Sequence, residues 1–101
     1  MKTGERILEI GPGRGALTKS LMSLDSEMSA IEIDRDLVAE LQTTFPRLYV
    51  LEADVMKCDL SIADGKRVVG NLPYNLSTPL LNKLFEQPGI TDMTFMLQKE
   101  V

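Results

Sequence analysis

The stretch Arg-Ile-Leu-Glu-Ile-Gly-Pro-Gly-Arg-Gly-Ala-Leu-Thr-Lys-Ser-Leu-Met, residues 6–22, decides the fold. Three of its first five residues are aliphatic, which is typical of a short buried strand. Three glycines within five residues then indicate a tight turn, and residues 16–22 carry apolar side chains three to four positions apart, as a helix does. A strand, a glycine turn and a helix in this order predict the opening of a βαβ unit.

The rest of the chain continues the alternation of strand and helix. We expect strands at residues 28–33, 48–51, 68–70 and 93–97, and helices at residues 35–45 and 78–85. Asp34 is suited to cap the first of these helices, and Pro46 to end it. Residues 55–66 have a weak pattern, with at most one short helical turn. The sequence therefore predicts an α/β fold of the Rossmann-like kind, a five-stranded and mainly parallel sheet with helices on both faces.

Composition limits the classes of function. With 101 residues, 44% of them hydrophobic, the chain is expected to form one globular domain, residues 1–101. Because it has no histidine and a single cysteine, Cys58, an intrachain disulfide, a His/Cys metal cluster and a His-dependent triad are excluded. The net charge of -4 gives no overall attraction for nucleic acid. Since no leader and no long apolar run is present, we expect a cytoplasmic protein without a membrane span.

The glycine turn is the first candidate binding element. Gly11, Gly13 and Gly15 let the backbone pass close to a ligand, and N–H groups at the start of the following helix are free to bind it. With Ala16 in the last position the turn also satisfies the permissive dinucleotide pattern, so an NAD site stays an alternative. A strand-to-helix turn that binds no ligand is the second alternative.

Acidic residues at the strand ends narrow the choice of cofactor. Glu32 can accept hydrogen bonds from both hydroxyls of a ribose, which fits either cofactor class. Asp54 can accept from the amino group of an adenine while the N–H of Val55 meets a ring nitrogen, and this suits S-adenosylmethionine better than a dinucleotide. Glu9 would face the cationic end of that cofactor, where a carboxylate is favourable.

The four residues Asn71, Leu72, Pro73 and Tyr74 are suited to hold an amino group of a base. The side-chain oxygen of Asn71 and the carbonyl of Leu72 can accept its two hydrogens, which turns the nitrogen lone pair toward a methyl donor. Pro73 stiffens the turn, and Tyr74 offers a ring for stacking. The base would have to be flipped out or single-stranded. An ordinary strand-ending turn with a core tyrosine is the alternative.

Several segments together resemble the ribosomal RNA adenine N6-dimethyltransferase family, which also contains the erythromycin-resistance methylases and the mitochondrial transcription factor B proteins. The segments that carry the resemblance are residues 9–18, 31–37, 54–55, 70–75, 77–79 and 96–101. They are spread over nearly the whole chain.

The resemblance implies a class I methyltransferase that transfers the methyl group of S-adenosylmethionine to adenine N6 of small-subunit ribosomal RNA. It implies that the glycine turn and Glu9 hold the methionine part, Glu32 the ribose, and Asp54 with Val55 the adenine. The cofactor-binding residues are then Glu9, Gly11, Gly13, Gly15, Glu32, Ile33, Asp54, Val55 and Asn71, and the catalytic residues Asn71, Leu72, Pro73 and Tyr74.

Members of the family are more than twice as long as this chain. They carry a segment before the first strand, and further strands and an RNA-binding domain after the motif that ends here at Val101. We therefore expect a methyltransferase core truncated at both ends, whose exposed sheet edge favours a homodimer. Two functions follow as alternatives: an active methyltransferase on adenine in RNA, or in DNA with relaxed choice, and a module that binds S-adenosylmethionine but has lost catalysis.

Overall fold

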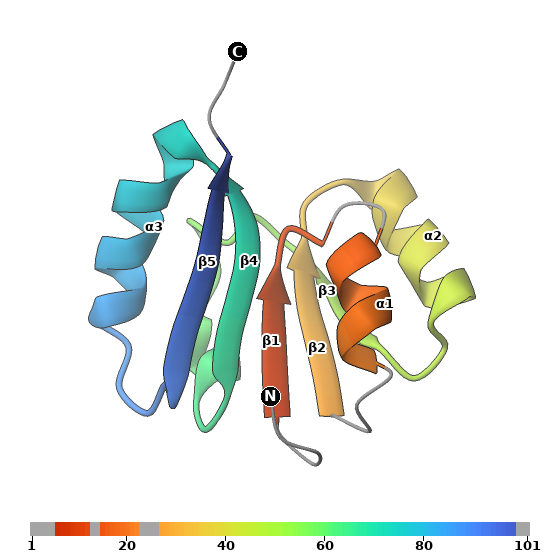
Figure 1. The fold of residues 1–101 in the computed structure, drawn as a ribbon, viewed down its shortest axis with the longest axis horizontal. Helices are drawn as coiled ribbons and strands as arrows, with labels where there is room; N and C mark the ends of the chain where they lie inside the picture. The colour runs from red at the N-terminus through yellow and green to blue at the C-terminus, as the bar shows by residue number, and fades with distance from the viewer. Residues whose placement is uncertain (1–5, 13–14, 23–26, 99–101) are drawn as a thin grey trace.

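The computed structural model describes residues 6–12, 15–22 and 27–98, and for residues 16, 71–77 and 96–98 it describes the backbone alone. The elements follow the predicted order (Figure 1). They are β1 (Arg6–Ile10), α1 (Ala16–Met22), β2 (Glu27–Glu32), α2 (Arg35–Thr44), β3 (Tyr49–Glu52), the 3₁₀ helix η1 (Leu60–Ala63), β4 (Arg67–Pro73), α3 (Tyr74–Phe85) and β5 (Asp92–Gln98). None of the helices in the described ranges is long and apolar enough to cross a membrane.

The five strands form one sheet in the order β3-β2-β1-β4-β5. All four neighbouring pairs are parallel, so the strands of Figure 1 point the same way. The predicted five-stranded Rossmann-like sheet is confirmed. Since β1 lies in the middle of a parallel sheet, the loops that follow β1, β2, β3 and β4 all leave from the same edge, the carboxyl edge.

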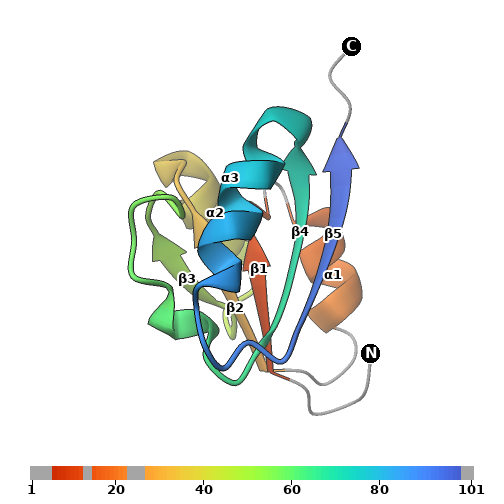
Figure 2. The same cartoon turned by 90° about the vertical axis from the view of Figure 1, so that its left-hand side faces the viewer.

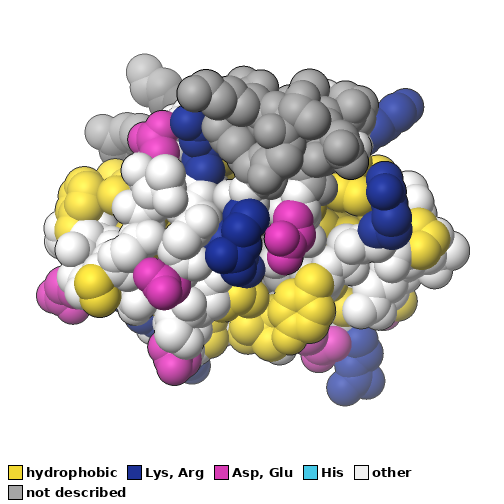
Figure 3. Space-filling model, turned by 90° about the horizontal axis from the view of Figure 1, so that it is seen from below, with side chains coloured by type: hydrophobic (Ala, Val, Ile, Leu, Met, Phe, Trp, Pro, Cys, Tyr) yellow, Lys and Arg dark blue, Asp and Glu magenta, His cyan; other side chains and the backbone are white. Residues whose placement is uncertain are grey.

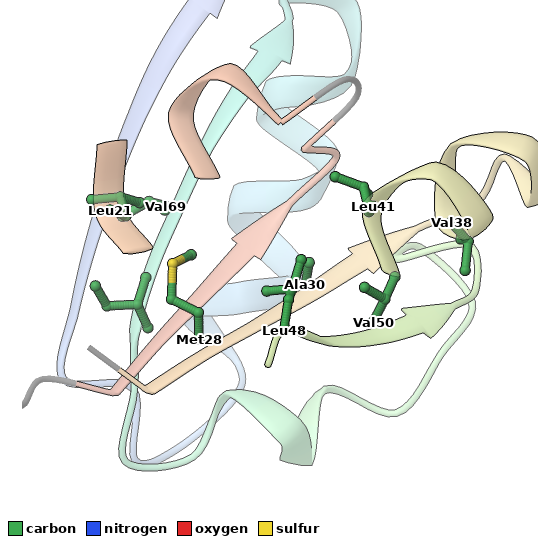
Figure 4. Packing of buried hydrophobic residues seen from close by; sticks show 9 residues of the cluster. Leu21, Met28, Ala30, Val38, Leu41, Leu48, Val50 and Val69 are labelled. Carbon is green, nitrogen blue, oxygen red and sulfur yellow. The ribbon is translucent and has the colours of Figure 1, made fainter. Parts of the chain in front are cut away.

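Helices cover both faces of the sheet, as expected. Alternate residues of β1 point to opposite faces: Ile7 belongs to a buried cluster with side chains of α1 and α2, and Leu8 to a second cluster with side chains of η1 and α3. Figure 2 shows α1 and α3 on opposite sides of the sheet, and Figure 4 shows the side chains of the first cluster. Each fully buried Leu, Ile or Val contributes about 1.5–3 kcal/mol, so these two layers supply most of the stability.

Ion pairs join neighbouring strands at the opposite, amino edge of the sheet. Arg6 at the start of β1 pairs in the ladder with Glu27 of β2, and their side chains form a salt bridge of 3.6 Å. Arg67 at the start of β4 does the same with Asp92 of β5 at 3.3 Å. Figure 3, seen from this end, shows basic and acidic side chains next to each other. Because each pair joins directly opposed residues, a shift by one residue would separate both.

Two elements differ from the sequence-based prediction by more than one residue at an end. Strand β4 extends three residues beyond the expected end, through Pro73, and α3 begins at Tyr74 instead of residue 78. Helix α3 therefore carries Pro79 inside it, where the proline can donate no hydrogen bond to the preceding turn. Leu80 and Leu84, which follow Pro79, are buried against the sheet.

Gly15 sets the distance between α1 and α2. Its φ of 88° is a left-handed conformation that favours glycine. A Cβ atom built there would lie 2.8 Å from Cε2 of Phe45 and 3.2 Å from Cδ2 of Leu41. Gly15 therefore allows the two helices to pack closely, independently of any ligand.

Gly15→Ala is expected to destabilise the fold more than Gly11→Ala does. Both residues have positive φ, which costs an alanine about 1–2 kcal/mol. Only at Gly15 does the new methyl group overlap a packed ring, and such overpacking adds about 1–3 kcal/mol. Urea unfolding of both variants measures the difference. Equal losses in the free energy of unfolding would show that Phe45 moves aside without cost.

Candidate cofactor-binding site

Two hydrogen bonds join the loops at the carboxyl edge. The N–H of Gly11, just after β1, donates to the carbonyl of Ile31 in β2 at 2.9 Å. The N–H of Ala53, just after β3, donates to the carbonyl of Glu32 at 3.0 Å. The ends of β1, β2 and β3 are therefore held side by side, and the candidate residues on them share one site.

Gly11 leaves space at this edge. Its φ is 64°, it is exposed, and a Cβ atom built on it would have no atom of the described chain within 4 Å. A ligand can approach the backbone here as closely as the hydrogen atoms of glycine allow. Gly13, the second glycine of the turn, lies outside the described residues.

Glu9 is buried directly beneath this turn. Glu9 is 2% exposed, and its Oε1 accepts a hydrogen bond from the hydroxyl of Thr18 on α1. Burial raises the pKa of the Glu9 carboxyl above its ordinary value of 4.5; the Thr18 hydrogen bond lowers this pKa in part, and the negative charge of Glu32 raises it. The site thus holds a carboxyl group whose charge is costly until a cation approaches it.

Glu32 and Ile33 mark the end of β2. Glu32 is 7% exposed, and its Oε2 accepts from the N–H of Asp34 at 3.1 Å, so the carboxylate is held at the edge. Ile33 lies one residue beyond the strand that was expected to include it, and it is 64% exposed. The same loop ends in the N-cap of α2, where Asp34 accepts from two backbone N–H groups as predicted. An aliphatic side chain exposed beside a fixed carboxylate can pack against a flat ring.

Asp54 and Val55 lie in a turn after β3, and both are half-buried. Oδ1 of Asp54 accepts from the N–H of Met56 at 2.9 Å, and its carbonyl accepts from the N–H groups of Lys57 and Cys58 at 2.9 and 3.0 Å. One carboxylate oxygen therefore orders the turn. The second oxygen stays able to accept from a ligand, since a carboxylate has about four acceptor positions.

The four candidate target-binding residues lie at the neighbouring strand end. Asn71, Leu72 and Pro73 are the last residues of β4, and Tyr74 is the first of α3; their side chains lie outside the described part of the chain. In the ladder Gly70 pairs with Ile10, so Asn71 and Gly11 follow at adjacent positions; Gly11 leaves the sheet there, whereas Asn71 stays in it, paired with Met96 of β5. The backbone brings the candidate catalytic segment next to the glycine turn.

A sequence model of one protein family, described as Ribosomal RNA adenine dimethylase, matches residues 1–101. The chain belongs to this family.

Known members support the assignment along the whole chain. Ribosomal RNA small subunit methyltransferase A of Marinomonas sp. (strain MWYL1) is 52% identical over 108 residues, which cover 99% of this chain and 41% of the relative. The chain thus spans about two fifths of the length of this adenine dimethylase relative. A dimethyladenosine transferase from Plasmodium falciparum has a TM-score of 0.82 with 28% identity, covering 97% of this chain and 37% of that one. The 23S rRNA methyltransferase ErmE has a TM-score of 0.81 with 27% identity, covering 97% and 41%. The fold is that of the class I methyltransferases.

The amino edge of the sheet is a poorer candidate for the cofactor-binding site than the carboxyl edge. A hollow of about 170 Å³ lies there between Arg6, Gly65, Arg67 and Thr91. Both arginines already have acidic partners in the salt bridges described above, which lowers their attraction for an anion. Within the described residues no group of three His, Cys, Asp or Glu side chains could hold a metal ion.

Sequence reasoning missed two residues that hold the site together. Thr18 lies nine positions after Glu9, and its hydroxyl was not recognised as the partner of the buried carboxyl. Lys83 of α3 donates to the carbonyl of Val55 from 28 positions away. A buried acid followed by a threonine on the next helix is a signal that could have identified Thr18. No local sequence pattern could have identified Lys83.

Glu9→Gln is expected to stabilise the ligand-free protein at neutral pH. Because the pKa of Glu9 is raised in the folded state, the unfolded state loses this proton first as pH rises. The contribution of Glu9 to the free energy of unfolding is thus full below about pH 4.5 and is lost as pH rises through the folded pKa. The glutamine amide has nearly the same shape as the carboxyl group but no charge, so Glu9→Gln removes the free-energy cost of a buried carboxylate.

The measurement is urea unfolding of the wild type and Glu9→Gln between pH 4 and pH 8, with the exposed Glu86→Gln as control. The wild type should lose stability relative to Glu9→Gln as pH rises, and the control should follow the wild type. A Glu9→Gln protein that is less stable than the wild type at neutral pH would mean that the Thr18 hydrogen bond outweighs the burial of charge.

Proposed function

We propose that the chain is the cofactor-binding part of an S-adenosylmethionine-dependent methyltransferase that methylates N6 of adenine in ribosomal RNA. The observation that carries the proposal is the position of the two segments: the register puts Asn71, on β4, beside Gly11, at the start of the glycine turn. A methyl donor on the turn and a base on the Asn71 segment would then be neighbours. Family membership supports the same reaction class.

Different residues of the carboxyl edge match different chemical parts of the methyl donor. The open space at Gly11 leaves room for the methionine part, and the buried Glu9 offers negative charge to its ammonium and sulfonium. Glu32, whose carboxylate accepts from the N–H of Asp34, would accept hydrogen bonds from the ribose hydroxyls, with Ile33 exposed beside it. The donor supplies a methyl group on positively charged sulfur.

Asp54 and Val55 would recognise the adenine ring of the donor by hydrogen bonds. The turn that Asp54 stabilises presents a carboxylate and a backbone N–H close together, which matches an amino group beside a ring nitrogen. This pair distinguishes adenine from a base that carries oxygen at the same position, because the carboxylate then meets another acceptor.

The target adenine would be held by Asn71, Leu72, Pro73 and Tyr74. The amide oxygen and the Leu72 carbonyl accept the two hydrogens of N6, so its lone pair leaves conjugation and points at the methyl carbon. Pro73 fixes the direction of the carbonyl, Tyr74 stacks on the ring, and the proton of N6 passes to solvent. An unpaired or flipped adenine in RNA is the substrate this arrangement requires. A homodimer and a cytoplasmic location remain predictions.

Binding of S-adenosylhomocysteine tests the cofactor site. Calorimetry is expected to show binding of S-adenosylmethionine and S-adenosylhomocysteine and none of NAD. Glu32→Gln should weaken binding about ten- to a hundredfold, since one charged hydrogen-bond acceptor is lost. Glu86→Gln, which makes the same change at an exposed residue just after α3, should bind as the wild type does. Binding of NAD alone would refute the proposal.

Methyl transfer tests the catalytic part. The chain is incubated with labelled donor and an unstructured adenine-containing RNA or DNA. Asn71→Ala should lower incorporation about a hundredfold, because the amine is no longer oriented. Asn82→Ala, which removes an exposed amide further along α3, is the matched control and should keep full incorporation. If the wild type binds the donor but incorporates no more label than Asn71→Ala, the chain is a binding module without catalysis.

A further inference from the structure

Lys83 connects α3 to the turn that carries Asp54 and Val55. Its Nζ donates to the carbonyl of Val55 at 2.8 Å and to the carbonyl of Cys58 at 2.9 Å, and the side chain is half-buried. The two acceptors are 28 and 25 positions away in sequence, so this is a tertiary contact.

The turn needs a donor at this place. Residues 54–58 form a single helical turn, in which the N–H groups of Lys57 and Cys58 both donate to the carbonyl of Asp54. Inside the turn the carbonyl of Val55 accepts a weak hydrogen bond from Sγ of Cys58 at 3.8 Å. The later carbonyls of such a short turn carry a partial negative charge and can accept further donors. The ammonium of Lys83 supplies two hydrogen bonds and a positive charge to these carbonyls. An apolar side chain in its place would leave the turn held by local bonds and by the Ala53 N–H bond to Glu32.

The position of α3 gives this contact a second consequence. The helix starts at Tyr74, directly after the Asn71 segment, and Lys83 lies in its last turn. The helix that begins at the candidate target segment is thus bonded at its other end to the candidate adenine loop. Figure 2 shows α3 packed along the same side of the sheet as η1, which follows that loop.

We propose that Lys83 is a positioning residue for the adenine ring of the donor: it holds the Asp54–Val55 turn so that carboxylate and N–H face the two edge atoms of the base. The inference rests on the proposed function, because it assigns the turn to adenine. A hydrogen-bonding pair discriminates between bases only when both groups are held in place, and a freed turn can rearrange around either base.

The test compares two ligands that differ only in the base. Affinities for S-adenosylhomocysteine and for S-inosylhomocysteine, which carries oxygen instead of the adenine amino group, are measured by calorimetry on the 101-residue chain. Lys83→Met keeps the apolar stem and removes the ammonium. It should weaken binding of S-adenosylhomocysteine about tenfold and reduce the preference for adenine over hypoxanthine by a similar factor.

The controls separate positioning from folding. Lys19→Met makes the same change at an exposed lysine of α1 and should keep the wild-type affinities and preference. Lys83→Gln, neutral but still polar, is measured in parallel and should also lose preference, which keeps the test decisive if Lys83→Met does not fold. Thermal unfolding shows whether each variant is folded at the temperature of the titration.

Three outcomes would overturn the inference. Unchanged affinity and unchanged preference for adenine in folded Lys83 variants would mean that the turn keeps its conformation without Lys83. Equal weakening of both ligands would make Lys83 a structural residue without influence on the base. If the wild type binds neither ligand, the proposed function fails, and the role of Lys83 fails with it; the first two outcomes leave the proposed function intact.

Discussion

The parallel pairing of β1 on both sides is the constraint on which the site depends. Ile10, the last residue of β1, is level with Ile31 of β2 and with Gly70 of β4, and Ile31 is level with Leu51 of β3. These four residues lie in one row near the carboxyl edge, and β4 continues three residues further, to Pro73. The backbone hydrogen bonds of the sheet therefore bring Gly11, Glu32 and Asn71 close to this row without a long loop between them.

The same site holds groups that oppose stability. A buried carboxyl at Glu9, whose pKa is raised by burial, costs free energy in the ligand-free protein, and the positive φ of Gly11 fixes a backbone that other residues avoid. Local conflicts of this kind are typical of functional positions. At the amino edge the side chains of Arg6 and Arg67 pair with acidic residues of the neighbouring strands, and burial lowers the pKa of Lys66, whose ammonium donates to the hydroxyl of Ser29.

The sequence predicted the elements whose signals are local. Strand β1 and helix α1 have the expected bounds because a glycine turn separates two clear apolar patterns, and Asp34 caps α2 because its side chain reaches N–H groups two and three residues on. The start of α3 was predicted four residues too late, because residues 74–77 carry no clear apolar pattern and Pro79 stands inside the helix. Thr18 was missed although its partner Glu9 lies only nine positions before it, and Lys83 could not be assigned, since its partners lie 28 and 25 positions away. The family resemblance was confirmed.

The most direct test of the central claim is a two-dimensional ¹H–¹⁵N NMR titration of the chain with S-adenosylhomocysteine. The account predicts that the amide signals of Gly11, Ile33 and Val55, at the ends of three different strands, shift together along one binding curve. The signals of Gly65 and Thr91, at the amino edge, should stay in place. Shifts confined to Gly65 and Thr91, or no shift at saturating ligand, would contradict the assignment of the carboxyl edge as the cofactor site.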